Sequence, residues 1–120
     1  MKDIHERTFE FACRVVRLHQ ALMKRRGADR TIANQLLRAA TSVGSNLEEA
    51  KAGQSRADFL AKARISLKEA RESHYWLRLI EATELLAAKQ IHPLTEEANE
   101  IVAVLTAIIK KASTSPRPLS

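Results

Sequence analysis

Apolar residues recur every three or four positions along most of the chain, and this spacing constrains the fold more than any other feature. The clearest run consists of Leu94, Ala98, Ile101, Leu105, Ile108 and Ala112. Each of these residues lies about one helical turn from the next, as on the buried face of an amphipathic helix. Gly and Pro, which β-rich folds need for their many turns, number only three each among 120 residues. The sequence therefore predicts an all-α protein.

Turn-forming residues divide this pattern into four helices, which we expect at about residues 3–26, 30–52, 56–86 and 93–113. Gly27 and Gly53 mark the first two connections, and residues 87–92 form the third. Pro93 then suits the first turn of the last helix, where its missing N–H would be unpaired in any case. Because short connections place successive helices antiparallel, we predict one domain over residues 1–113, an up-down-up-down antiparallel four-helix bundle. Residues 114–120 contain two prolines and little to bury, so they are expected to be a disordered tail.

The positive charge is concentrated in two of the four helices. The net charge is +6, with a sequence pI near 9.9, and the excess falls in residues 1–26 and 55–90. Basic stripes with a ring that can stack are used to bind phosphate backbones, and Tyr75 lies among the basic residues of the third helix. The candidate nucleic-acid-binding residues are Arg7, Arg14, Arg17, Arg64, Lys68, Arg71 and Arg78. The alternative is a solvated surface neutralised by ion pairs such as Glu10–Arg14 and Lys68–Glu72.

The third helix carries a second apolar stripe beside its core face, made of Ile65, Trp76 and Ile80. A single bundle needs only one apolar face on each helix, and an exposed stripe of this kind invites association. Trp is also a common anchor of subunit interfaces. We therefore interpret the stripe as a candidate oligomer interface. The alternative is that Trp76 only covers the edge of the bundle.

The second helix contains a polar stretch of small residues opposite its apolar face. Its polar members are Arg38, Ser42, Ser45, Asn46 and Glu49. Composition alone favours a solvated outer face for them. The glycine within this stretch, at position 44, costs about 1 kcal/mol relative to Ala in the middle of a helix, which indicates a close packing contact.

No arrangement of residues in the sequence indicates catalysis. The four histidines lie on different elements without metal-ligand spacing, the glycines are scattered singly, and Cys13 is the single cysteine. We expect no metal, no cofactor and no enzymatic activity from one chain, with a site shared between subunits as the alternative. The absence of a long apolar run or a signal peptide, together with the single thiol, favours a cytoplasmic protein without a membrane partner.

Residues 34–86 carry an ordered series of motifs in the second and third helices. The helix-two motif covers Gln35, Leu36, Arg38, Ala39, Ser42, Ser45, Asn46 and Glu49, and it is followed by Ser55, Asp58, Phe59, Leu60, Glu72 and Leu79. This series resembles the signature of bacterial four-helix-bundle proteins encoded in intervening sequences of large-subunit ribosomal RNA genes. Lys68-Glu69-Ala70 and Tyr75-Trp76-Leu77 are similar to a motif of one subgroup. Three positions depart from the pattern, with Val43 and Leu47 in place of Ile and Ala50 in place of Gly.

The resemblance implies a ring-like homo-oligomer, commonly a pentamer, whose biochemical role is mostly unassigned. A distant relative, the accessory variability protein of diversity-generating retroelements, is a basic pentameric barrel that binds nucleic acid and a reverse transcriptase. By this resemblance Arg38, Ser42, Asn46 and Glu49 become candidate interface residues that form hydrogen bonds between subunits. We therefore expect a non-catalytic homo-oligomer that binds RNA or DNA without strong sequence specificity. The alternative is a protein-interaction scaffold with no nucleic-acid role.

Overall fold

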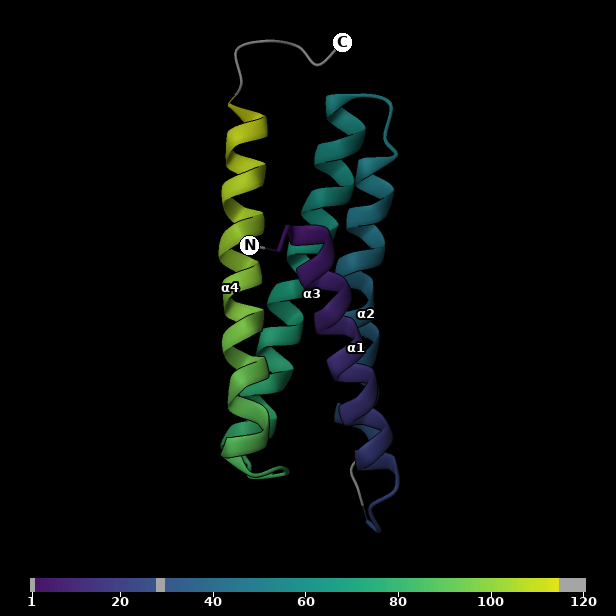
Figure 1. Cartoon of the computed structure of the whole chain (residues 1–120), viewed down its shortest axis with the longest axis vertical. Coiled ribbons are helices and arrows are strands. Elements are labelled where there is room, and N and C mark those ends of the chain that lie inside the picture. The colour runs from purple at the N-terminus through teal and green to yellow at the C-terminus, as the bar shows by residue number, and fades with distance from the viewer. Residues whose placement is uncertain (1, 28–29, 115–120) are drawn as a thin grey trace.

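The chain forms four long helices that run alternately up and down, which confirms the predicted all-α antiparallel bundle (Figure 1). The computed structural model describes residues 2–27 and 30–114. The helices are α1 (Ile4–Met23), α2 (Arg30–Lys51), α3 (Arg56–Ala82) and α4 (Ala88–Ser113). Residues 115–120, which make up most of the expected tail, lie outside the described part of the chain. None of the four helices, over the residues described, is apolar and long enough to cross a bilayer.

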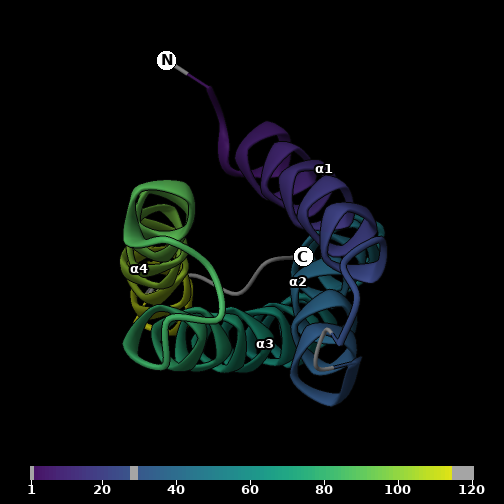
Figure 2. The same cartoon turned by 90° about the horizontal axis from the view of Figure 1, so that it is seen from below.

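Each helix packs against its neighbours in the sequence, in the order that Figure 2 shows, and α1 also contacts α4. The α2–α3 packing is the most extensive, and the α1–α4 packing is the least. Over the described residues, α1 makes no contact with α3, and α2 makes none with α4. The helices α1 and α3 are therefore diagonal partners, so their outward faces point to opposite sides of the bundle.

The core extends along the bundle in two parts. The larger part contains, among others, Phe11, Val15, Leu36, Val43, Leu47, Leu77, Ile91, Ile101 and Leu105. In Figure 1, α1 stops short of the end where α2 turns into α3, so this end is built from three helices. There α3 and α4 form a second, smaller cluster around Leu60, Ala63 and Ile109.

Ile80 belongs to the main core, so the prediction that it lies on an exposed stripe with Ile65 and Trp76 is wrong. Only 1% of Ile80 is exposed, whereas Ile65 is 41% exposed and Trp76 is partly buried against the core. The reason is that α3 packs on both α2 and α4. A helix that packs between two neighbours buries an arc of its surface that is wider than a single apolar stripe.

The third connection begins earlier than expected because α3 ends at Ala82 and not near Leu86. Glu84 adopts φ 59°, a left-handed conformation that Gly usually provides at helix ends. The N–H of Leu85 bonds to the carbonyl of Ile80, and that of Glu84 bonds to the carbonyl of Glu81. These two bonds form a Schellman motif. No glycine marks this helix end, which is why the sequence pattern missed it.

The fourth helix begins at Ala88, so the prediction that Pro93 occupies its first turn is wrong. Pro93 lies in the second turn, where its missing N–H leaves the carbonyl of Lys89 without its usual helical donor. Lys89 is exposed, so water can satisfy that carbonyl.

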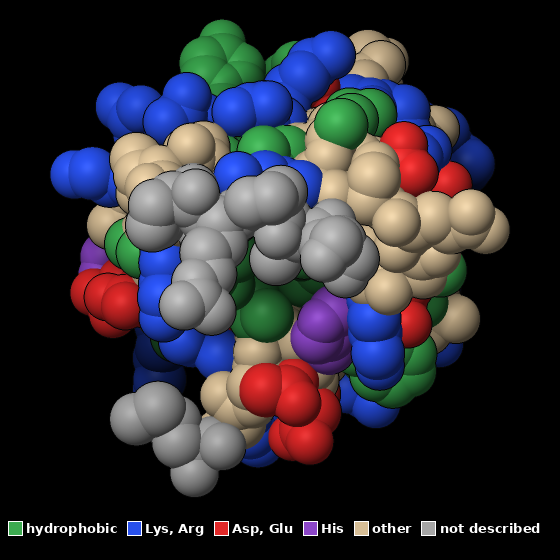
Figure 3. All heavy atoms as spheres, turned by 90° about the horizontal axis from the view of Figure 1, so that it is seen from above, with side chains coloured by type: hydrophobic (Ala, Val, Ile, Leu, Met, Phe, Trp, Pro, Cys, Tyr) green, Lys and Arg blue, Asp and Glu red, His purple; other side chains and the backbone are tan. Residues whose placement is uncertain are grey.

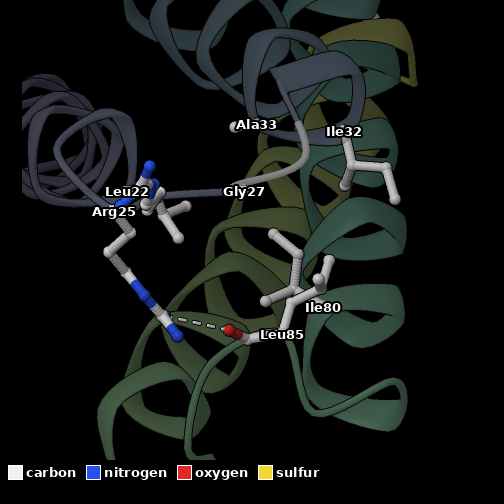
Figure 4. A pocket seen from close by; sticks show the side chains of 8 residues that line it. Leu22, Arg25, Gly27, Ile32, Ala33, Ile80 and Leu85 are labelled. Carbon is white, nitrogen blue, oxygen red and sulfur yellow. Dashed lines mark hydrogen bonds between the residues drawn. The ribbon is translucent and has the colours of Figure 1, made fainter.

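The first two connections contain Gly27 and Gly53, as the sequence predicts. α1 ends at Met23, and Gly27 then adopts φ 76° in the turn that follows. The Oγ of Ser55 accepts a hydrogen bond from the N–H of Asp58 and caps the start of α3. At the lower end of the bundle, the Nη1 of Arg25 donates to the carbonyl of Leu85 over 3.1 Å. This bond ties the first connection to the third beside a cavity of about 90 Å³ (Figure 4).

The packing contact expected at Gly44 is with α1. A Cβ atom built at Gly44 would lie 3.4 Å from the Oγ1 of Thr8, which is itself buried. Position 44 therefore tolerates only a small side chain, because α1 passes close to α2 at this level.

Candidate nucleic-acid interface

Four basic residues of α3 share one exposed face of the helix. Arg64, Lys68, Arg71 and Arg78 are all exposed, and their spacing of about one turn aligns them along the helix. Tyr75 occupies the remaining turn of the same face and is 54% exposed. From Arg64 to Arg78 this face extends about 21 Å at 1.5 Å per residue. We call these five residues the α3 stripe.

The cations of the α3 stripe form no ion pair with any described residue. The neutralising pairs that the sequence suggested do not form. Glu10 pairs with Lys2, at 2.6 Å, and not with Arg14. Glu72 is engaged by Arg38 of α2 and not by Lys68. The charge of the stripe is therefore available to an external anion.

Arg7 does not belong to an available basic surface. Its Nη2 and Nε donate to the two carboxylate oxygens of Glu97 on α4, over 2.7 and 3.1 Å. This hydrogen bonding to Glu97 raises the pKa of the Arg7 guanidinium further above its usual value. The pair joins α1 to α4, the least extensive contact in the bundle. Arg7 therefore has a structural role in this fold, and its role in phosphate binding stays a prediction.

The remaining basic candidates of α1, Arg14 and Arg17, are exposed but lie on the helix diagonal to α3. The two predicted basic surfaces therefore do not converge within one chain. Figure 3 looks onto the end where α2 turns into α3. It shows Lys and Arg side chains most densely along the upper edge, with others at the left, right and lower edges.

Tyr75 is held beside Trp76 by a chain of contacts that starts on α2. The two rings meet edge to face, with centroids 5.1 Å apart and planes at 73°. The indole Nε1 of Trp76 donates to Glu72 over 3.0 Å. Glu72 also accepts a hydrogen bond from Arg38. This chain of contacts fixes the aromatic pair on the surface of α3.

The candidate interface residues of α2 bond within the chain. Ser42 donates to the carbonyl of Arg38, and Asn46 donates to that of Ser42, over 2.7 and 2.8 Å. Glu49 pairs with Lys62 of α3 at 2.9 Å. Arg38 and Glu49 thus pair across the seam between α2 and α3, whereas Ser42 and Asn46 bond to carbonyls of α2 itself.

The sequence reading missed the acidic partners of this seam, Glu69 and Glu72. Arg38 and Glu72 are equidistant in sequence from Ser55, the N-cap of α3. Val43 and Ser66 are nearly equidistant from it. The Oγ of Ser66 donates to the carbonyl of Val43 over 2.6 Å. In an antiparallel helical hairpin, residues equidistant from the connection face one another. This rule, applied to the α2–α3 connection, would have identified the pairing.

The histidines lie apart, and the described residues contain no cluster of three or more His, Cys, Asp or Glu suited to a metal ion. His92 bonds through Nδ1 to Glu81 and through Nε2 to Glu96, at 3.1 and 2.9 Å. Hydrogen bonds to Glu81 and then Glu96 raise the pKa of His92. Burial, and then the charge of Arg78, lower the pKa of His74.

Comparison with known proteins gives a family assignment. A model of the 23S rRNA-intervening sequence protein family matches residues 2–107. A solved structure of a protein of unknown function, from the S23 ribosomal protein family of Bacteroides thetaiotaomicron VPI-5482, is 39% identical in sequence. Its TM-score is 0.85, and the match covers 90% of this chain and 99% of that chain. No curated protein matches this chain.

Proposed function

The chain belongs to the 23S rRNA-intervening sequence protein family, and we propose that it is a non-catalytic helical bundle that binds RNA or DNA without strong sequence specificity. The observation that carries the proposal is the α3 stripe. It presents four exposed cations in a row, none of them paired with a described residue. A polynucleotide is the common polymer that offers a matching row of negative charges.

The geometry of the stripe favours contacts with phosphates over contacts with base edges. Its cations lie along one helix that is packed between α2 and α4, and Lys and Arg contacts with phosphates carry no sequence information. Contacts of this kind are sequence-neutral and strongly salt-dependent. Four such contacts give a slope of about −3 in log affinity against log salt for a single strand.

We propose further that the protein self-associates, because its surface retains exposed apolar side chains. Phe9 is 69% exposed, and Val16 of the same helix and Ile65 of α3 are also exposed. Phe9 and Thr41 border a groove between α1 and α2. A homo-oligomer carries one α3 stripe for each subunit, so assembly would multiply the basic surface. Sedimentation velocity tests this point, and a monomer at micromolar concentration would reject it.

The binding proposal is tested by titrating labelled RNA and DNA with the protein at two salt concentrations. The test variant carries Lys68→Ala and Arg71→Ala, which remove two charges from the α3 stripe. The matched control carries Arg30→Ala and Lys89→Ala, which remove two exposed charges from the first turns of α2 and α4. We expect the test variant to bind more weakly, with a salt slope reduced by about 1.4, and the control to resemble the wild type.

The outcome that rejects the proposal is no binding by the wild type at about 50 mM salt, where phosphate contacts are strong. Equal weakening by the two double variants would also reject it, because binding would then follow net charge and not the stripe. A protein-interaction scaffold with an acidic partner would then be the better hypothesis.

A further inference from the structure

We infer that the α3 stripe takes a single-stranded polynucleotide, and that Tyr75 is the residue on which one of its unpaired bases stacks. The inference rests on the proposed polynucleotide binding and specifies its substrate class. Tyr75 lies one turn from Arg71 on one side and one turn from Arg78 on the other. A strand whose phosphates follow these cations would therefore pass directly over the phenol ring.

The ring of Tyr75 is open and positioned for stacking. More than half of the residue is exposed. The edge-to-face contact with Trp76 leaves at least one face of the phenol ring uncovered by the indole. Because the Trp76 indole is itself hydrogen-bonded to Glu72, the phenol packs against a fixed partner. A ring that is already ordered loses less freedom when a base stacks on it.

A duplex would gain little from this arrangement. Its bases are stacked inside the helix, and only phosphates and groove edges reach a flat or convex protein surface. Cations arranged around an aromatic side chain are the combination that single-strand binders use. Such stacking tolerates any base, because every base has a π-face. The low sequence specificity of the proposed function is consistent with this mode of binding.

The decisive probe is a strand that keeps its phosphates but lacks its bases. Fluorescence anisotropy would compare three ligands of about 12 nucleotides: a base-bearing strand, the same strand with abasic sites, and a duplex. RNA and DNA versions of the base-bearing strand would both be used, since they share the same ring faces. The proteins would be the wild type, Tyr75→Phe and Tyr75→Leu, each checked for helical content by circular dichroism.

We expect the wild type and Tyr75→Phe to bind the base-bearing strands about 5- to 150-fold more tightly than the abasic strand. Tyr75→Leu, which lacks a π-face, should bind the base-bearing and abasic strands alike. Equal binding of both strands by the wild type, tighter binding of the duplex, or retained discrimination in Tyr75→Leu would each overturn the inference.

These failures are distinguishable from failure of the proposed function. If all three ligands bind and binding falls in the Lys68→Ala/Arg71→Ala variant, phosphate binding stands and only the stacking role is rejected. If none binds at about 50 mM salt, both proposals are rejected.

Discussion

The guanidinium of Arg38 on α2 donates a hydrogen bond of 3.1 Å to the carboxylate of Glu69 on α3. Glu69 is only 9% exposed, whereas the Arg38 side chain retains about half of its exposure. Arg38 also binds Glu72 one turn away. One cation therefore pairs with two carboxylates at the most extensive helix contact of the bundle.

Replacing Arg38 with Ala is expected to destabilise the bundle, because Glu69 would stay almost buried without its cation. A hydrogen bond to a charged group contributes about 1.5–3 kcal/mol, and the exposure of Arg38 reduces this toward about 1–2 kcal/mol. Urea denaturation would measure the loss. The matched control is Arg64→Ala, which removes an exposed cation of the α3 stripe and should change the free energy of unfolding by less than about 0.5 kcal/mol. Equal effects of the two substitutions would contradict the structural role of Arg38.

Ile80 and Ile65 provide a second matched pair, since both belong to the apolar stripe expected from the sequence. Ile80→Ala should lower the free energy of unfolding by about 2–5 kcal/mol, because it leaves a cavity in the core. Ile65→Ala removes a partly exposed side chain and should have little effect on the fold of one chain. Its expected effect is on self-association, measured by sedimentation velocity. A mild Ile80→Ala variant would show that the core tolerates a void at this position.

Glu84→Gly is expected to stabilise the protein. A non-glycine residue in the left-handed region is strained by about 1–2 kcal/mol, and part of the relief is offset by the greater freedom of Gly in the unfolded chain. The net gain should be about 0.5–1 kcal/mol, which thermal unfolding followed by circular dichroism would measure. Glu84→Ala serves as the control, because it keeps the same strained conformation and should show no such gain. A lower Tm for Glu84→Gly would argue against the Schellman ending of α3.

His92 should make the stability of the α3–α4 end depend on pH. Its pKa is raised in the folded state by Glu81 and Glu96, above the value of about 6.5 expected for the unfolded chain. The stabilisation is therefore complete below about pH 6.5 and is lost as the pH rises through the folded-state pKa.

The measurement is the Tm of the wild type and of His92→Gln between about pH 5.5 and about pH 8.5. The wild type should lose stability relative to the variant as the pH rises. His74, whose pKa is lowered, acts in the opposite direction but equally in both proteins, so the comparison removes its effect. A difference in Tm that stays constant across this range would contradict the prediction.

The residue spacing determined the helices and the faces within each helix. The α3 stripe follows from spacing alone, because residues three and four positions apart share a side of any helix. Gly27 and Gly53 mark the first two connections correctly, since Gly interrupts a helical pattern locally and both residues lie between helices. The end of α3 could not be predicted from the sequence, because Glu84 adopts a left-handed backbone conformation that is unusual for a glutamate.

Only the tertiary structure decided what each face meets. In the folded chain Ile80 is buried and Arg7 pairs with Glu97. The helices α1 and α3 lie on opposite sides of the bundle, so the two basic surfaces predicted from the sequence do not join. The physical reason is that a helical repeat fixes angles around one axis but contains no information about where neighbouring axes lie. Those positions follow from the packing of all four helices at once, and they determine which charges remain for a partner.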